Sequence, residues 1–173
     1  MAISLYDLSV ASYLQTLGAV AAFLERGRAH FTEKGTDLAE IVETRLFPDM
    51  MPLRFQVQSV AHHSLGAIEG VGKGEFRPPA NLAALDYGGL EKLVADTRQA
   101  LERLDRAEID ALEGRDVVFH IRDRQVPFTA EGFLLSFSLP NFYFHATTAY
   151  DILRTKGVPV GKRDFLGRLR MKS

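Results

Sequence analysis

The sequence predicts an all-α fold: an up-down-up-down four-helix bundle with one short extra helix and a small β-hairpin before the last helix. Apolar residues recur at helical spacing over four long stretches of the chain. Glycine- and proline-rich segments separate these stretches, and one short stretch is instead rich in β-branched and aromatic residues. Helices with one apolar face pack together as a bundle. We therefore expect a single domain over residues 1–173, with residues 158–173 as a tail that packs on the bundle or leaves it.

The first long helix is predicted over about residues 4–30. Its apolar positions at helical spacing are Val10, Leu14, Leu17, Ala21 and Leu24. Gly35 breaks this pattern. Thr36 or Asp37 can then cap a short helix, with Glu40 at capping-box spacing from Asp37, and this short helix should end near Phe47.

Two further long helices follow. The first covers residues 53–71 and ends in the glycine-rich segment 70–74. Residues 75–86 contain two adjacent prolines and are interpreted as an irregular surface crossing. Leucines at helical spacing over residues 90–104 predict the third long helix, and Asp105 begins a further short turn of helix.

The β-rich stretch consists of residues 117–121 and 125–128 and predicts a two-stranded hairpin. Pro127 requires an edge position, because proline cannot donate a hydrogen bond to a neighbouring strand. The last helix is predicted over residues 130–156. We expect a kink or a break at Pro140 inside it.

Composition excludes several classes of function. The chain has no cysteine, which excludes disulfides, thiolate zinc sites and cysteine nucleophiles. The formal net charge is −1, so neither nucleic acid nor an anionic membrane surface is an expected partner. The apolar run at residues 17–24 is too short to span a bilayer. These features favour a cytoplasmic protein that does not enter a membrane.

The candidate site consists of His63, Asn141 and His145. Asn141 and His145 are four residues apart, so they share one face of the last helix. His63 borders the inner face of the second long helix, whereas the adjacent His62 should point to solvent or to the rim. The three side chains could hold a divalent metal such as zinc or nickel, or a small ligand. Without a metal, His145 oriented by Asn141 could act as a general base. The other alternative is a hydrogen-bonded polar core that binds nothing.

Two other groups of side chains could take part in binding. The aromatic residues of the last helix, which could line a pocket, are expected to lie in the core or in a homodimer interface; they are Phe142, Tyr143, Phe144 and Tyr150. The tail is basic and could contact phosphate, but a short charged tail is expected to be solvated; its charged residues are Lys162, Arg163, Asp164, Arg168, Arg170 and Lys172.

Several blocks of sequence also resemble a known family. They are Leu5-Tyr6-Asp7, Pro48-Asp49-Met50, Gln56-Val57-Gln58, residues 139–145, Thr148-Ala149-Tyr150, Ile152-Leu153-Arg154, residues 157–162 and residues 164–167. On these blocks the chain resembles the bacterial domain-of-unknown-function family nineteen-ninety-three, a branch of the DinB/YfiT-like superfamily. The resemblance implies a DinB-like four-helix bundle, often dimeric, of a class regarded as metalloenzymes.

In that superfamily a histidine of the second long helix and a His-x-x-x-His pair of the last helix bind a divalent metal. The matching positions here are His63, Asn141 and His145, with His62 as an alternative for the first. Asparagine therefore stands where the pattern has histidine, and the ligand set is incomplete. The sequence leaves open whether the protein is a metal-dependent enzyme or a non-catalytic dimeric interaction protein.

Overall fold

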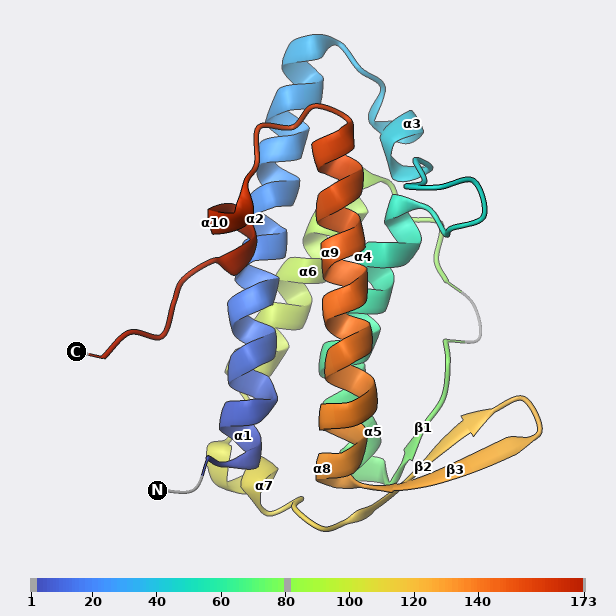
Figure 1. Cartoon of the computed structure of the whole chain (residues 1–173), viewed down its shortest axis with the longest axis vertical. Coiled ribbons are helices and arrows are strands. Elements are labelled where there is room, and N and C mark those ends of the chain that lie inside the picture. Colours follow the sequence, from blue (N-terminus) through green and yellow to red (C-terminus); the bar gives the residue numbers. More distant parts are fainter. Residues whose placement is uncertain (1–2, 80–81, 173) are drawn as a thin grey trace.

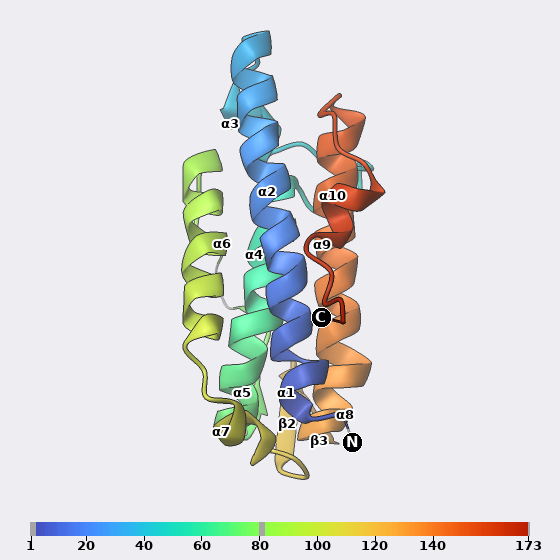
Figure 2. The ribbon, with the colours of Figure 1, turned by 90° about the vertical axis from the view of Figure 1, so that its left-hand side faces the viewer.

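Four long helical runs lie side by side in the computed structural model, which describes residues 3–79 and 82–172 (Figures 1 and 2). Two of the runs contain a π-helical turn between two α-helical parts. In chain order the runs are α1 (Leu5–Leu8) with α2 (Val10–Lys34); α4 (Leu53–Ala61), η1 (His62–Gly66) and α5 (Ala67–Lys73); α6 (Tyr87–Glu102); and α8 (Ala130–Phe133), η2 (Leu134–Ser138) and α9 (Leu139–Thr155). The fold is thus mostly helical, with a small sheet at one end.

Three short helices complete the helical part: α3 (Leu38–Val42), α7 (Arg106–Asp110) and α10 (Lys162–Leu166). The predicted caps of α3 and α7 are confirmed, because the carboxylates of Asp37 and Asp105 accept hydrogen bonds from the first turns of these helices. The prediction that the short second helix reaches Phe47 is wrong, since α3 ends at Val42. Helix α10 was not predicted, and it lies against α2 (Figure 2).

The predicted up-down-up-down order is wrong at the third long run. Helix α6 begins beside the C-terminal part of α2, where Tyr87 contacts Phe31. It ends near α1, where Arg98 and Glu102 share a groove with Tyr6. Helix α6 is therefore antiparallel to α2 and parallel to the α4–α5 run (Figure 1). The connection from β1 to α6 is long enough to return to the opposite end of the molecule, which a short loop could not do.

The sheet has three strands, in the order β1-β2-β3. Strands β2 (Asp116–Ile121) and β3 (Arg124–Thr129) form the predicted antiparallel hairpin, and Pro127 lies on the edge strand as expected. Strand β1 (Glu75–Phe76) pairs with β2 in parallel. This pairing corrects the prediction that residues 75–86 are irregular throughout.

The core lies between the long runs and is rich in aromatic side chains. Helices α2 and α9 run in the same direction, because Tyr13 contacts Phe142 and Phe23 contacts Tyr150, with ring centroids 4.9 and 6.1 Å apart. Gly27 permits a close approach of α2 and α6, since a Cβ atom there would lie 2.5 Å from the Tyr87 hydroxyl.

The break expected at Pro140 takes the form of the π-helical turn η2, which directly precedes α9. Proline lacks the N–H that an α-helical hydrogen bond needs, and its ring collides with the preceding turn. The wider turn before Pro140 gives the ring more room, although it does not replace the missing N–H, and the last helical run continues with little change of direction (Figure 1).

The helical run Leu5–Lys34 is long and apolar enough to cross a membrane by length and composition, which the apolar run at residues 17–24 alone did not indicate. Half of its most apolar window is buried inside the protein. Core helices of soluble proteins share these properties, so the run is weak evidence for a membrane span.

Candidate functional site

A small cavity lies where the α4–η1 run, the η2–α9 run and the sheet meet. It encloses about 140 Å³. Its lining residues are Phe55, Ser59, His62, His63, Phe76, Pro78, Pro79, Phe119, Phe137 and His145. We call this the imidazole cavity, because three histidines and a shell of aromatic side chains make up most of its wall.

His63 and His145 come from different helical runs and face each other in this cavity. Their rings are nearly parallel, with 16° between the planes and 5.7 Å between the centroids. The Nδ1 atom of His63 is buried and has no hydrogen-bond partner within the described residues. Two of the three residues predicted for the site are therefore brought together by the fold.

Gln56 determines the tautomer of His145. The Gln56 side-chain amide donates to the Met51 carbonyl through Nε2, at 2.8 Å, so its Oε1 is the atom that faces His145. Oε1 lies 2.8 Å from His145 Nδ1, which must therefore carry the proton and donate. The lone pair of His145 then resides on Nε2, the nitrogen available to an occupant of the cavity.

His62 also lines the cavity, contrary to the prediction that it points to solvent or to the rim. Its ring packs on Phe76, with centroids 4.5 Å apart, and its Nε2 is buried without a hydrogen bond of normal geometry. The reason is the π-helical turn that begins at His62, because the wider turn changes the angle between successive side chains. Two adjacent histidines can thus border one cavity.

A hydrogen-bonded chain fixes the backbone at His63. The Ser138 hydroxyl donates to the His63 carbonyl at 2.6 Å, and the Tyr13 hydroxyl lies 2.8 Å from the same Ser138 oxygen. Because Ser138 has a single proton, Tyr13 is the donor in the second bond. These two hydrogen bonds connect α2 to both π-helical turns and hold the two turns against each other.

Burial keeps the three imidazoles neutral. It lowers the pKa of His63 to about 3 and that of His145 to about 4, with a further contribution from neighbouring imidazoles. The pKa of His62 is also lowered by burial, although the backbone of Arg77 partly offsets the shift. No lining side chain among the described residues is a carboxylate, a lysine or an arginine. The site is therefore uncharged at neutral pH and presents free imidazole nitrogens.

Asn141 does not line the cavity in the part of the chain that the structure describes. Its side-chain amide donates to the Phe137 carbonyl on the same helical run, at 2.7 Å. This local bond keeps the Asn141 amide on its own helical run. The predicted trio is thus only partly assembled, with His62 and not Asn141 beside the other two histidines.

Comparison with known proteins identifies the family. The model of the family described as Domain of unknown function (DUF1993) matches residues 5–166. The chain belongs to this family.

The DUF1993 chain also matches a solved structure over nearly its full length. A crystal structure of a DinB family member protein from Shewanella denitrificans is similar to it, with a TM-score of 0.80 and 26% sequence identity. The match covers 98% of this chain and 95% of that chain. A search of curated proteins finds no significant match. The resemblance to DUF1993 and to DinB proteins inferred from the sequence is confirmed.

The donor set of this DUF1993 protein fits a metal ion in its chemistry and not in its number of ligands. Neutral imidazoles with free nitrogens are preferred ligands of zinc and nickel. Within residues 3–79 and 82–172, however, no group of three or more histidine or acidic side chains is close enough together to hold an ion. An ion here would have to complete its coordination with water or a small molecule.

Sequence reasoning missed several residues of the site. Gln56 precedes His63 by seven residues, which is two helical turns, so the spacing could have placed it on the same face. No comparable signal exists for Phe76 and Phe119. They come from the sheet, and only the pairing of β1 with β2 brings them over the histidines.

Proposed function

We propose that the imidazole cavity binds a divalent ion of the class that imidazole prefers, zinc or nickel, through His63 and His145. The observation that carries the proposal is the buried, unpartnered Nδ1 of His63 beside a His145 whose lone pair Gln56 directs to Nε2. A buried polar atom without a partner costs about 1–3 kcal/mol. An occupant that accepts an imidazole lone pair removes this cost.

The surroundings support the same proposal. The neutral state of the histidines means that no proton has to leave before an ion binds at neutral pH. Histidines that bind a metal usually have an outer-shell hydrogen-bond partner that fixes the ring and its tautomer. Gln56 plays this part for His145. When bound, such an ion would supply a Lewis acid inside an aromatic-walled space. With only two firm protein ligands, we expect weak and exchangeable binding.

Calorimetric titration of metal-free protein with Zn²⁺ and with Ni²⁺ tests the proposal. We expect one ion per chain, abolished by His63→Gln and by His145→Gln. Gln56→Leu should weaken binding by about 10–100-fold, the usual effect of losing an outer-shell partner. Asn141→His restores the His-x-x-x-His spacing and should tighten binding.

His30→Gln is the matched control, because His30 lies near the C-terminal end of α2 and does not line the cavity. Circular dichroism of each variant separates lost binding from lost folding. Titration curves of His63→Gln and His145→Gln that coincide with the wild-type curve would show that the ion binds elsewhere. The cavity would then be a polar core.

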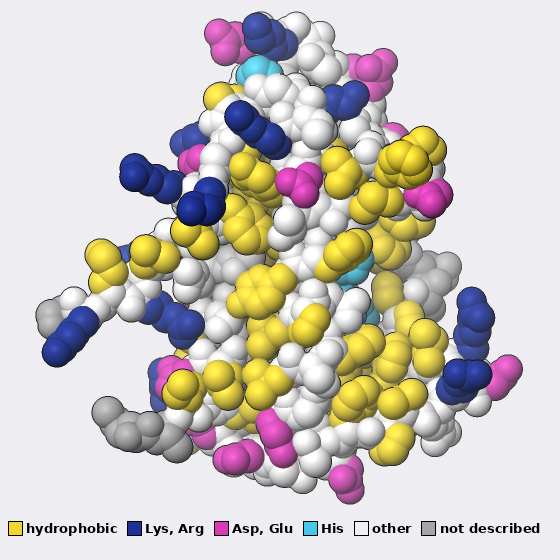
Figure 3. Space-filling view, in the orientation of Figure 1, with side chains coloured by type: hydrophobic (Ala, Val, Ile, Leu, Met, Phe, Trp, Pro, Cys, Tyr) yellow, Lys and Arg dark blue, Asp and Glu magenta, His cyan; other side chains and the backbone are white. Residues whose placement is uncertain are grey.

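We also propose that the chain forms a homodimer through the outer face of α9 and the loop before α4. Large apolar side chains are exposed there, with Phe47 63% and Phe144 57% accessible, and hydrophobic side chains gather over α9 in Figure 3. Monomeric proteins rarely expose extended apolar patches. Tyr143 and Phe144 also border a hollow of about 480 Å³. A face with both a projecting side chain and a hollow suits a two-fold interface, in which each copy fills the other.

Sedimentation equilibrium tests the dimer. Phe144→Ser should shift the wild-type dimer toward monomer, whereas Ile121→Ser, an exposed apolar residue of the hairpin, should leave it unchanged. A monomeric wild-type chain at micromolar concentration would refute the proposal. The cytoplasm remains the proposed compartment.

A further inference from the structure

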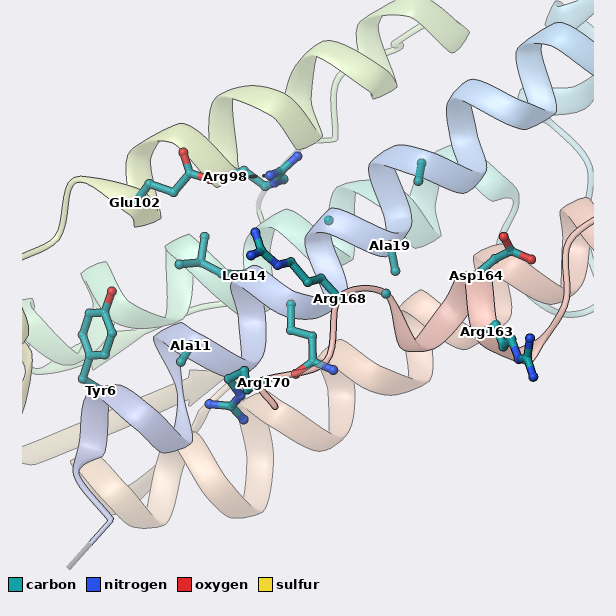
Figure 4. Close-up of a pocket in the computed structure, with 14 residues that line it drawn as sticks. Tyr6, Ala11, Leu14, Ala19, Arg98, Glu102, Arg163, Asp164, Arg168 and Arg170 are labelled. Atoms are coloured by element: carbon teal, nitrogen blue, oxygen red, sulfur yellow. Dashed lines mark ion pairs between the residues drawn. The ribbon is translucent and has the colours of Figure 1, made fainter. Parts of the chain in front are cut away.

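We propose that a second hollow, the arginine groove, binds a small anion that carries an apolar body, such as a medium-chain carboxylate or phosphate monoester. The groove follows the outer face of α2 between α6 and the C-terminal segment (Figure 4). Its volume is about 680 Å³, within the usual range for small-molecule sites. Its lining residues are Tyr6, Ala11, Leu14, Gln15, Gly18, Ala19, Ala22, Arg98, Glu102, Arg163, Asp164, Gly167, Arg168 and Arg170.

The wall formed by the C-terminal segment is fastened to the bundle, although the sequence predicted a solvated basic tail. The Gln15 side chain donates to the Leu166 carbonyl at 3.0 Å, and Arg26 forms an ion pair with Asp164 at 2.9 Å. Gly167 has a left-handed φ of 61°, and a Cβ atom there would lie 3.1 Å from the Gln15 carbonyl oxygen. Glycine thus allows the segment to cross directly over α2.

The walls carry excess positive charge. Four arginines and two carboxylates line the groove. Asp164 is already paired with Arg26, and Glu102 lies 3.5 Å from Arg98. Arg168 extends across α2 toward α6, which bears Arg98, whereas Arg163 points away (Figure 4).

The hydrogen-bonding groups of Arg98 are only partly satisfied. Its Nε atom is buried and makes no hydrogen bond within the described residues. Arg170 uses its guanidinium on the Asp7 carbonyl, at 3.1 Å, which holds the end of the segment in place. Carboxylates and phosphates satisfy guanidinium donors in planar, often bidentate pairs. An anion between Arg98 and Arg168 would accept hydrogen bonds from the accessible guanidinium N–H groups of the two side chains.

The floor of the groove is apolar and roomy. It consists of small or aliphatic side chains of α2, including Ala11, Leu14 and Ala22. At Gly18 a Cβ atom would meet nothing within 4 Å. A bare inorganic anion would leave this floor in contact with water, whereas an alkyl or aryl body would cover it. Charge on the rim and apolar surface below therefore favour an amphiphilic anion.

The groove and the imidazole cavity have no lining residue in common. The two proposals therefore stand or fall separately. Loss of metal binding would leave anion binding in the groove untouched.

Calorimetric titration with decanoate and decyl phosphate tests the inference, and inorganic phosphate and decyltrimethylammonium report the separate contributions of head group and chain. We expect both amphiphilic anions to bind with one site per chain. Phosphate should bind more weakly, and the cation should not bind. Arg98→Gln and Arg168→Gln should each weaken binding by at least about tenfold, the loss of one charge-assisted contact.

Gly18→Leu should abolish binding, because the leucine side chain occupies the floor of the groove, where a Cβ atom at position 18 meets nothing within 4 Å. Gly72→Leu is the matched control, since Gly72 is also a helical glycine with open space around it and lies outside the groove. Arg124→Gln on the hairpin is the control for the arginine variants.

Three results would overturn the inference: no binding of either amphiphilic anion in the millimolar range, equal binding by Gly18→Leu and wild type, or a change of oligomeric state in Gly18→Leu. The last result would assign the groove to contact between copies of the chain.

Discussion

The imidazole cavity and the arginine groove differ in how much water reaches their polar groups. The cavity is small and walled by aromatic rings, so its histidines are held neutral and its lining has no charged side chain. The groove is several times larger and open, so its arginines keep their charge beside an apolar floor. One small, mostly helical protein thus presents two hollows of opposite chemistry, because burial removes charge in one and solvation preserves it in the other.

Phe76 and Phe119, the sheet residues that lie over the histidines, form the aromatic roof of the imidazole cavity. Truncating this roof should have the largest effect on the contrast between the cavity and the groove. Phe76 is 4% exposed and contacts His62, Phe119 and Phe133. Phe76→Ala should destabilise the protein by about 3–5 kcal/mol, the usual cost of truncating a buried phenylalanine. It should also abolish metal binding and leave anion binding in the groove intact.

Urea denaturation with Val126→Ala as the exposed control measures the stability. A change below 1 kcal/mol for Phe76→Ala would mean that the roof is not part of the core.

Lowering the pH should destabilise the protein through the histidines of the imidazole cavity. The folded pKa values of His63 and His145, about 3 and about 4, lie below the ordinary value of 6.5. The unfolded chain therefore takes up protons first, and stability that is present above pH 6.5 is lost as the pH falls toward 4 and below. Denaturation at a series of pH values checks this. A profile for the His63→Gln, His145→Gln double variant that is as steep as that of wild type would contradict the assignment.

Helix α2 has one glycine on its closely packed side and one in the groove, so the same substitution compares the two sides. Gly27→Ala should destabilise by about 1–3 kcal/mol, because its Cβ collides with a buried tyrosine hydroxyl that donates to the Leu24 carbonyl. Gly18→Ala should instead stabilise by about 0.5–1 kcal/mol, since the groove leaves its Cβ free. Thermal unfolding of the two variants decides the matter. If both substitutions change the stability in the same direction, the groove is not open in solution.

The smallest expected effect concerns the link between α2 and the cavity. Tyr13→Phe deletes the donor to Ser138 and should cost about 1 kcal/mol. It should also weaken metal binding, because the His63 backbone loses part of its support, whereas Tyr143→Phe on the exposed face should change neither quantity. If the metal affinity of Tyr13→Phe is unchanged, the hydrogen bonds from Tyr13 through Ser138 to His63 contribute to stability alone.

The candidate site shows how far local patterns reach. The spacing of Val57, Val60 and Ala67 was enough to place His63 near the interior, and the Asn141–His145 spacing was enough to put both on one helix face. Neither pattern could anticipate the π-helical turn at His62 or the local bond of Asn141 to Phe137. Neither feature has a residue spacing that marks it in the sequence.

By itself the sequence determined the helical runs, the caps at Asp37 and Asp105, the hairpin and the family. These depend on interactions between residues close along the chain, and the family on sequence blocks alone. The tertiary structure alone decided the direction of α6, the pairing of β1, the roof over the histidines and the docking of the basic tail. Those features join residues far apart in the chain, and short-range periodicity carries no information about such contacts.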